Sequence, residues 1–224
     1  DRPWEVVEDP AVELVVEVMG GRDPAFDLVR TALEHGKPVV TANKELIAAR
    51  GPALLEAAAG HGVALLFEAA VGGAIPIIRP LSETLAGERI ERVMGIVNGT
   101  TNFILTRMAD DGSDFAAALA EAQALGYAEA DPTADGSGAD AAAKASILAS
   151  LAFATWVGPE HVYREGIAGL SPIDLAFAAD LGYAVRLLAI AERTSAGVCA
   201  RVHPAFVPLD HPLAAVRGAT NAIL

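Results

Sequence analysis

The chain has 224 residues, of which 53% are hydrophobic and 20% charged, so it can bury a sizeable core and is not expected to be disordered. The formal net charge of -13 argues against nucleic acid as a partner, because an acidic surface repels a phosphate backbone. No apolar run reaches the roughly 20 residues that a membrane span needs. A single cysteine, Cys199, excludes an intramolecular disulfide and indicates a reducing compartment, so we expect a cytoplasmic protein.

The first third of the chain alternates strands with helices. We expect no signal peptide at its start, because residues 1–10 lack an apolar core. Apolar runs predict strands over residues 12–19, 37–41 and 63–67, and helical spacing of apolar residues predicts helices over residues 24–35 and 45–59. Strands that alternate with helices imply right-handed crossovers and a parallel sheet.

Residues 1–67 are therefore predicted to form the C-terminal half of a Rossmann-type dinucleotide-binding domain. The sequence contains no Gly-x-Gly-x-x-Gly segment, which is the signature of the half that grips the pyrophosphate. We expect that half to precede residue 1.

The pattern changes after residue 67. Helices are predicted over residues 76–85, 101–110, 115–125 and 172–181, with a long helix that begins near residue 139. Strands are predicted over residues 89–97, 185–191 and 198–207, and residues 126–138 are expected to form a loop. Residues 68–224 are thus predicted to be an α+β domain with one sheet covered by helices, in a chain of the α/β class.

Four acidic residues crowd the predicted loop and the start of the long helix: Glu129, Asp131, Asp135 and Asp140. Carboxylates this close together are costly unless a cation neutralises them, so the cluster suits a ligand that carries an ammonium group. The alternative is a solvated loop in which Asp140, in a Ser-x-x-Asp pattern, only caps the start of the helix.

Lys144 follows Asp140 by four residues, which places both side chains on one face of the helix. Alanines and larger apolar residues surround them, so the helix is predicted to be buried on several sides. Partial burial favours the neutral amine and the nearby carboxylate opposes this, so Lys144 is predicted to give and take a proton. The alternative is a surface ion pair worth at most about 1 kcal/mol.

Two further segments carry polar groups at the ends of predicted strands. Lys44 follows the strand over residues 37–41, where ligands bind in parallel sheets, although Asn43 and Lys44 could equally be a helix cap and a solvated first-turn residue. Glu68 precedes a glycine-rich segment whose main-chain oxygens could face a hard cation. The alternative is that this segment is only a glycine-rich loop between two elements and binds no ligand. Cys199 is predicted to lie in a strand without an activating partner, so nucleophilic catalysis is not expected.

Several segments together resemble homoserine dehydrogenases. They are Val-Glu-Val-Met-Gly-Gly at residues 16–21, Thr-Ala-Asn-Lys at 41–44, Glu-Ala-Ala-Val-Gly-Gly-Ala-Ile-Pro at 68–76, Asn-Gly-Thr-Thr-Asn-Phe-Ile-Leu at 98–105 and Gly-Tyr-Ala-Glu-Ala-Asp-Pro-Thr-Ala-Asp at 126–135. Residues 211–223 resemble the late strand region of the family. The resemblance covers almost the whole chain.

The resemblance implies oxidoreduction between L-homoserine and L-aspartate 4-semialdehyde with NAD or NADP, on the route toward threonine, methionine and isoleucine. It implies that Lys144 is the proton donor and acceptor. Glu129 and Asp140 are similar to the family's homoserine contacts, which Asp135 would assist.

The remaining implied sites concern the cofactor, a cation and a partner chain. Lys44 is similar to the family's lysine near the nicotinamide and the substrate, and Gly20 and Gly126 are similar to cofactor contacts. A monovalent-cation site, usually sodium, would be built largely from main-chain oxygens of Glu68, Val71, Gly73 and Ile75. Residues 68–224 would be the substrate-binding, catalytic and dimerisation domain of a homodimer.

Two rival interpretations remain open at this point. The chain could be a catalytically silent dimerisation scaffold, and without a phosphate-binding loop it is expected to bind cofactor weakly or not at all. It could also be an aspartate-semialdehyde dehydrogenase, but that chemistry needs an activated thiol, and Cys199 lacks the setting.

Overall fold

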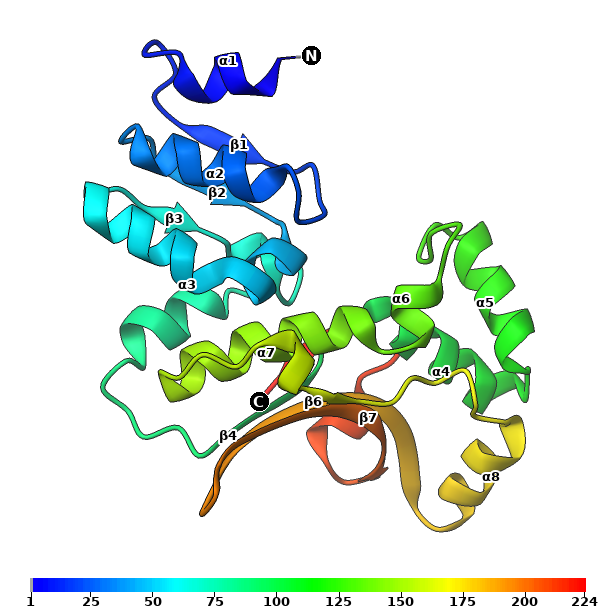
Figure 1. Ribbon diagram of the computed structural model, residues 1–224. Helices are drawn as coiled ribbons and strands as arrows, with labels where there is room; N and C mark the ends of the chain where they lie inside the picture. The colour runs from blue at the N-terminus through cyan, green and yellow to red at the C-terminus, as the bar shows by residue number, and fades with distance from the viewer. Residues whose placement is uncertain (1) are drawn as a thin grey trace.

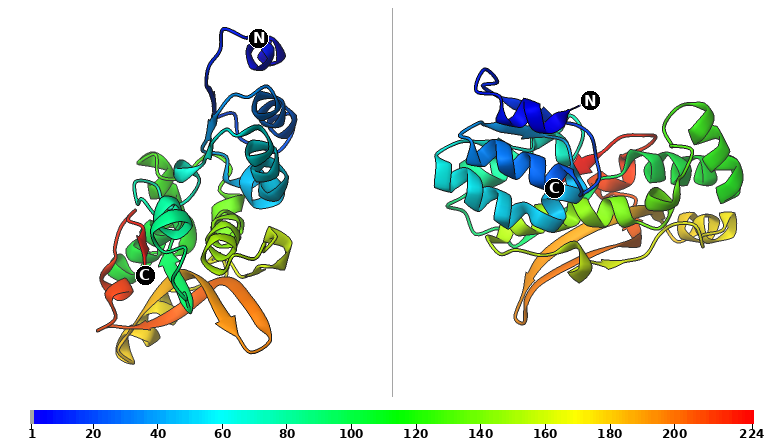
Figure 2. Two further views of the ribbon diagram at one scale, coloured as in Figure 1. Left: turned by 90° about the vertical axis from the view of Figure 1, so that its left-hand side faces the viewer. Right: turned by 45° about the horizontal axis from the view of Figure 1, so that its top comes forward.

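A computed structural model describes residues 2–224 and shows two parts, each built on its own sheet (Figure 1, Figure 2). In the first part, the strands β1 (Val15–Glu17), β2 (Val39–Thr41) and β3 (Leu65–Leu66) pair in this order, and all are parallel. Helices α2 (Ala25–Glu34) and α3 (Lys44–His61) connect them and pack against each other. The predicted partial nucleotide-binding sheet is thus confirmed.

The observed strands are shorter than the predicted ones. Strand pairing covers residues 15–17, 39–41 and 65–66, whereas Leu14 and Val18 remain exposed beside β1. The short helix α1 (Pro3–Glu8) was not predicted, because among its residues only Val7 is buried and one apolar contact produces no helical period.

The second part contains a five-stranded sheet in the order β5-β7-β6-β4-β8. Strands β6 (Tyr183–Thr194) and β7 (Gly197–Pro208) form a long antiparallel hairpin, and β4 (Arg92–Ile96) pairs antiparallel with β6. Helix α7 (Ala139–Phe153) lies along one face of this sheet and contacts both β6 and β7 (Figure 1). The prediction of one sheet covered by helices is confirmed.

Four other helices complete this part: α4 (Gly99–Asp111), α5 (Phe115–Ala124), α6 (Thr133–Gly136) and α8 (Pro172–Asp180). Short helical turns lie at η1 (Glu68–Ala70), η3 (Pro159–His161) and η4 (Pro212–Ala215). None of the helices within residues 2–224 is long and apolar enough to cross a bilayer.

Three details differ from the sequence predictions. The helix predicted over residues 76–85 is only a wide helical turn, η2 (Pro80–Thr84), and the predicted loop over residues 126–138 contains α6. The two-residue strands β5 (Tyr163–Arg164) and β8 (Ala222–Ile223) exist only as partners of longer strands. Elements this short carry no periodic signal, so tertiary pairing decides them.

Helix α7 also joins the two parts. It packs against α3, and a single apolar core includes Leu46 and Ile47 of α3 together with Ile147 and Leu148 of α7. This packing fixes the start of α3 relative to the start of α7, and the polar residues described next lie at those two helix starts.

Candidate active site

A hydrogen-bond network holds the loops at the carboxyl ends of β1 and β2. The buried carboxylate of Glu17 accepts the Met19 amide at 2.7 Å and the Thr41 hydroxyl at 2.6 Å. Asn43 accepts the Leu46 amide at 3.0 Å and donates to the Gly21 carbonyl at 2.7 Å. Asn43 therefore caps α3, as one sequence interpretation proposed, and it also fixes the glycine turn that follows β1.

Lys44 is more than a solvated first-turn residue. Its Nζ lies 3.0 Å from Oδ1 of Asp140, and its side chain is 37% exposed. Lys44 comes from α3 in the first part and Asp140 from α7 in the second, so this ion pair joins the two parts directly.

Asp140 does not cap its helix. Helix α7 starts after Gly138, which has a positive φ of 76° and no side-chain cap, and Asp140 is only 8% exposed. The interpretation of Asp140 as a simple cap is thus wrong. Its Oδ2 instead accepts a hydrogen bond of 2.7 Å from Lys144.

Lys144 lies behind Asp140 with a side chain that is 16% exposed, so the interpretation as a surface ion pair is also wrong. Its Nζ donates to the Val97 carbonyl at 2.9 Å, at the end of β4, as well as to Asp140. An ammonium group has three donors. Two are used within the described part of the chain, so one N–H remains for a ligand.

Asn98, the next residue after Val97, connects two of the carboxylates. Its Nδ2 donates to Asp135 at 2.6 Å and to Asp140 at 2.8 Å, and its Oδ1 accepts the Thr101 amide at 2.7 Å as the cap of α4. Asn98 was not among the site residues predicted from the sequence. An Asn before a helix signals a cap, but contacts with residues 37 and 42 positions away leave no local signal.

The charges of the site depend on these contacts. Burial raises the pKa of Asp140, but Lys144, Lys44 and Asn98 together outweigh burial and hold that pKa below its ordinary value. Burial likewise lowers the pKa of Lys44, and Asp140 more than reverses this shift. Burial raises the pKa of Asp135 above its ordinary value despite the Asn98 hydrogen bond. At neutral pH Asp140 is therefore a carboxylate and Lys44 an ammonium.

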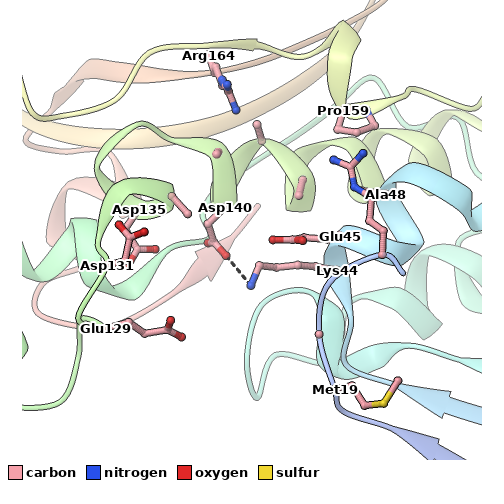
Figure 3. Close-up of a pocket in the computed structure, with 16 residues that line it drawn as sticks. Met19, Lys44, Glu45, Ala48, Glu129, Asp131, Asp135, Asp140, Pro159 and Arg164 are labelled. Atoms are coloured by element: carbon pink, nitrogen blue, oxygen red, sulfur yellow. Dashed lines mark ion pairs between the residues drawn. The ribbon is translucent and has the colours of Figure 1, made fainter. Parts of the chain in front are cut away.

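A cleft of about 560 Å³ opens between the two parts in front of these groups. Of the residues predicted from the sequence, Gly20, Lys44, Glu129, Asp135 and Asp140 line it. Figure 3 shows Asp131 and Asp135 together on one side of the cleft, with the Lys44–Asp140 ion pair beside them and Glu129 at its lower edge. Arg22 and Arg164 also line the cleft and were not predicted.

The other predicted residues lie away from the cleft lining. Lys144 is placed behind Asp140, and Gly126 follows α5 in the exposed turn that ends that helix, with φ +77°. The carboxylate of Glu68 accepts the amides of Ile78 at 2.8 Å and Arg79 at 3.0 Å, so both of its oxygens are used to start the helical turn that includes η2. Cys199 lies in β7 as predicted, outside the cleft lining.

A parallel sheet whose strand ends face such a cleft is the arrangement of nucleotide-binding α/β proteins. A family model described as the NAD binding domain of homoserine dehydrogenase matches residues 3–68, in agreement with that class. A second model, described as homoserine dehydrogenase, matches residues 76–224. The chain belongs to the homoserine dehydrogenase family, which confirms the resemblance seen in its motifs.

Individual relatives agree with this assignment. The homoserine dehydrogenase of Mycobacterium leprae is 56% identical over 229 residues, which cover 100% of this chain and 52% of the relative. The crystal structure of a homoserine dehydrogenase from Thiobacillus denitrificans has a TM-score of 0.96 at 50% identity and covers 99% of this chain and 52% of its own.

A hyperthermophilic archaeal homoserine dehydrogenase in complex with NADPH has a TM-score of 0.85 at 34% identity and covers 99% of this chain and 64% of its own. The chain thus spans about half the length of the curated relatives that it matches.

Proposed function

We propose that the protein containing this chain interconverts L-homoserine and L-aspartate 4-semialdehyde with NAD or NADP, on the route toward threonine, methionine and isoleucine. The observation that carries the proposal is the buried Asp140 carboxylate, which pairs with Lys44 on one oxygen and Lys144 on the other at the edge of an acidic cleft. Family membership supports the same reaction.

Lys144 is the proposed proton donor and acceptor. In the reducing direction, negative charge develops on the oxygen of the aldehyde, and an ammonium group within reach of that oxygen supplies the proton. Two hydrogen bonds, to Val97 and Asp140, fix the amine and leave its third N–H for the substrate oxygen. Lys44 makes an ion pair with Asp140 and, as an ammonium group, has further N–H donors for the same oxygen.

The acidic side of the cleft is the proposed site for the substrate's own ammonium group. Glu129 and Asp135 line the cleft, and they join Asp140 as substrate contacts in this proposal. Carboxylates bind an ammonium through charge-assisted hydrogen bonds. The site would therefore select an amino acid over an uncharged aldehyde of the same length.

The residues of this chain could contact a nicotinamide cofactor, but they include no loop of the usual kind for its pyrophosphate. Gly20 and Lys44 follow strand ends and line the cleft, and with Gly126 they are the proposed cofactor contacts. The sequence has no Gly-x-Gly-x-x-Gly loop for the pyrophosphate. When bound, the cofactor supplies or accepts the hydride at the substrate carbon, and the chain's own residues hold the substrate and move the proton.

The test compares the chain with an extended protein, in which the chain is joined at both ends to the corresponding segments of the Mycobacterium leprae relative. We expect the extended protein to oxidise L-homoserine with NADP or NAD, measured as absorbance of the reduced cofactor. No turnover would contradict the proposal and favour a silent scaffold. Alkylation of Cys199 should leave turnover intact, whereas its loss would favour an aspartate-semialdehyde dehydrogenase.

A monovalent cation, sodium, is a further part of the proposal. No group of three or more His, Cys, Asp or Glu side chains within residues 2–224 could hold a metal ion, so the main-chain oxygens of Glu68, Val71, Gly73 and Ile75 would have to supply the ligands. Consecutive positive φ angles of 81° and 62° at Gly72 and Gly73 bend this segment sharply. A higher thermal midpoint in sodium chloride than in choline chloride of equal ionic strength would support the site.

We also propose that residues 1–67 and 68–224 are separate domains and that the second forms a homodimer. Exposed apolar side chains gather on α8 and the adjoining end of the β6–β7 hairpin, where Leu209 donates its amide to Gly182. They are Ile173, Phe177, Leu181, Phe206 and Leu209, each about 60% exposed or more. Phe177→Glu should then yield a monomer in light scattering, while Leu55→Glu on α3 should not.

A further inference from the structure

Asn98 occupies the junction between β4 and α4, where it is 5% exposed and where its side-chain oxygen and nitrogen both make hydrogen bonds. The orientation of its amide follows from chemistry. The Thr101 amide can only donate, so it requires the Asn98 oxygen, and the Asn98 nitrogen must then face the carboxylates of Asp135 and Asp140.

The contacts of Asn98 also constrain its two partners. A single nitrogen lies 2.6 Å from one carboxylate and 2.8 Å from the other, so two like charges are held side by side. Both of its N–H groups need an acceptor, and an ionised carboxylate is acceptor-only. The amide therefore favours the ionised form of each carboxylate, against the mutual repulsion that would protonate one of them.

We propose that Asn98 is a positioning residue that keeps Asp135 and Asp140 ionised and adjacent, so that one carboxylate is ready for the substrate ammonium while the other orients Lys144. This inference rests on the proposed function only in its second half, because the ionisation of the two carboxylates is a property of the chain itself. Asn98 would act through its partners, since it lies behind them and does not line the cleft.

The other charged groups that line the cleft or contact the two carboxylates are Arg22, Lys44, Glu45, Glu129, Asp131, Lys144 and Arg164. The two lysines favour ionisation of Asp140 and Asp135. None of these groups is itself altered when Asn98 alone is substituted, so we assign a change in titration to the loss of the amide.

The test is a carbon-13 NMR titration of the aspartate carboxyls in this chain, without substrate or cofactor. Asn98→Ser keeps an oxygen that can cap α4 but is too short to reach both carboxylates. We expect the titration midpoint of Asp135 to rise by about one pH unit, because a hydrogen bond to the charged form is lost. In the extended protein, the acid limb of kcat/KM should move to higher pH by a similar amount.

Two further variants separate this role from simple helix capping. Asp114→Ala removes the cap of α5, where Asp114 accepts the Ala117 amide, and it should lower the thermal midpoint without moving either titration. Asn98→Asp keeps the oxygen that caps α4 and adds a third negative charge, so it should raise the titration midpoints of Asp135 and Asp140 further. This variant replaces Asn98→Ser in the test if Asn98→Ser does not fold.

Unchanged carboxylate midpoints in both folded Asn98 variants would overturn the inference. Because this titration needs no turnover, shifted midpoints in a chain whose extended form is inactive would leave the ionising role of Asn98 standing and refute the proposed reaction alone.

Discussion

At Asp140, burial and ion pairing act in opposite directions on a single carboxylate. Its side chain is 8% exposed, which alone would favour the neutral acid, yet two ammonium groups and one amide contact its two oxygens. Buried ion pairs of this kind contribute little net stability, but removal of one partner leaves an uncompensated charge. Single substitutions around Asp140 are therefore informative about both folding and activity.

Lys144→Ala should lower kcat of the extended protein by about 100-fold or more with little change in KM, because proton transfer matters mainly in the transition state. Lys144→Arg keeps the positive charge but does not release a proton at neutral pH, so kcat should fall there as well. Steady-state kinetics of both variants would measure this. Near-normal kcat for the alanine variant would refute the role of Lys144, and near-normal kcat for the arginine variant would leave it a purely electrostatic role.

Asp140→Asn should lower the free energy of unfolding by about 2–3 kcal/mol at neutral pH, less than for a fully buried pair because Lys44 is 37% exposed. The folded pKa of Asp140 lies below its ordinary value of 3.8, so its contribution is present above that pH and disappears as the pH falls through the folded value. The pKa of Asp135 is instead raised in the folded chain, so protonation of Asp135 favours the folded state at low pH. This contribution is lost as the pH rises through the raised pKa.

Urea unfolding between pH 7 and pH 3 would check this expectation. The difference between the wild-type chain and Asp140→Asn should shrink below about pH 4. Asp111→Asn is a matched control, because Asp111 forms an exposed ion pair with Arg107 on α4 and should change stability little at any of these pH values. A difference that stays constant with pH would mean that the charge of Asp140 does not contribute.

At the scale of elements, the start of α7 depends on a close approach between two main chains. The Ile167 amide donates to the Gly136 carbonyl at 3.0 Å, and a Cβ atom on Gly166 would collide with that same carbonyl. Gly136 ends α6, two residues before Gly138 starts the helix that carries Asp140 and Lys144. A small side chain at position 166 would therefore displace the helix start that positions the acidic site.

Gly166→Ala should destabilise the chain by about 1–3 kcal/mol, because the obstacle is main chain rather than a flexible side chain. Turnover of the extended protein should fall as well. Gly169→Ala is the control, since nothing lies within 4 Å of a Cβ atom there. Thermal unfolding of the two variants would measure the difference. Equal midpoints would show that the main chains at residues 136 and 166 can move apart without loss of stability.

At the scale of the whole molecule, the site exists only where the two parts meet. Lys44, on α3 of the first part, reaches Asp140 on α7 of the second part, and Lys144 reaches the Val97 carbonyl just after β4. The packing of α3 on α7 holds the two helix starts together. A change in the angle between the parts would thus alter the Lys44–Asp140 contact before any other contact of the site.

The chain by itself should bind NADPH weakly, with a dissociation constant at least about 100-fold higher than that of the extended protein. The reason is the missing phosphate loop, since a helix start with free amides is the main anchor of a pyrophosphate. Titration calorimetry of both proteins would measure this. Tight binding by the chain alone would show that the three strands suffice for the cofactor.

Local sequence patterns were enough to predict the two-part architecture and the side chains that carry the proposed chemistry. Alternating apolar segments gave the parallel sheet, and the spacing of Asp140 and Lys144 gave their ion pair, because four residues on a helix always return to the same face. Local patterns did not indicate the two-residue strands β5 and β8, whose pairing partners lie far away in sequence, or the four-residue helix α6, which is too short to show a helical period.

The sequence by itself determined which groups are available: two lysines, a row of carboxylates and a glycine turn after a strand. Only the tertiary structure decided that Asp140 is shared between Lys44 and Lys144, that Asn98 joins it to Asp135, and that Glu68 is used to start a helical turn. The physical reason is that contacts along a helix follow from its fixed geometry, whereas contacts such as those of Asn98 with Asp135 and Asp140, 37 and 42 residues away, depend on how complete layers pack.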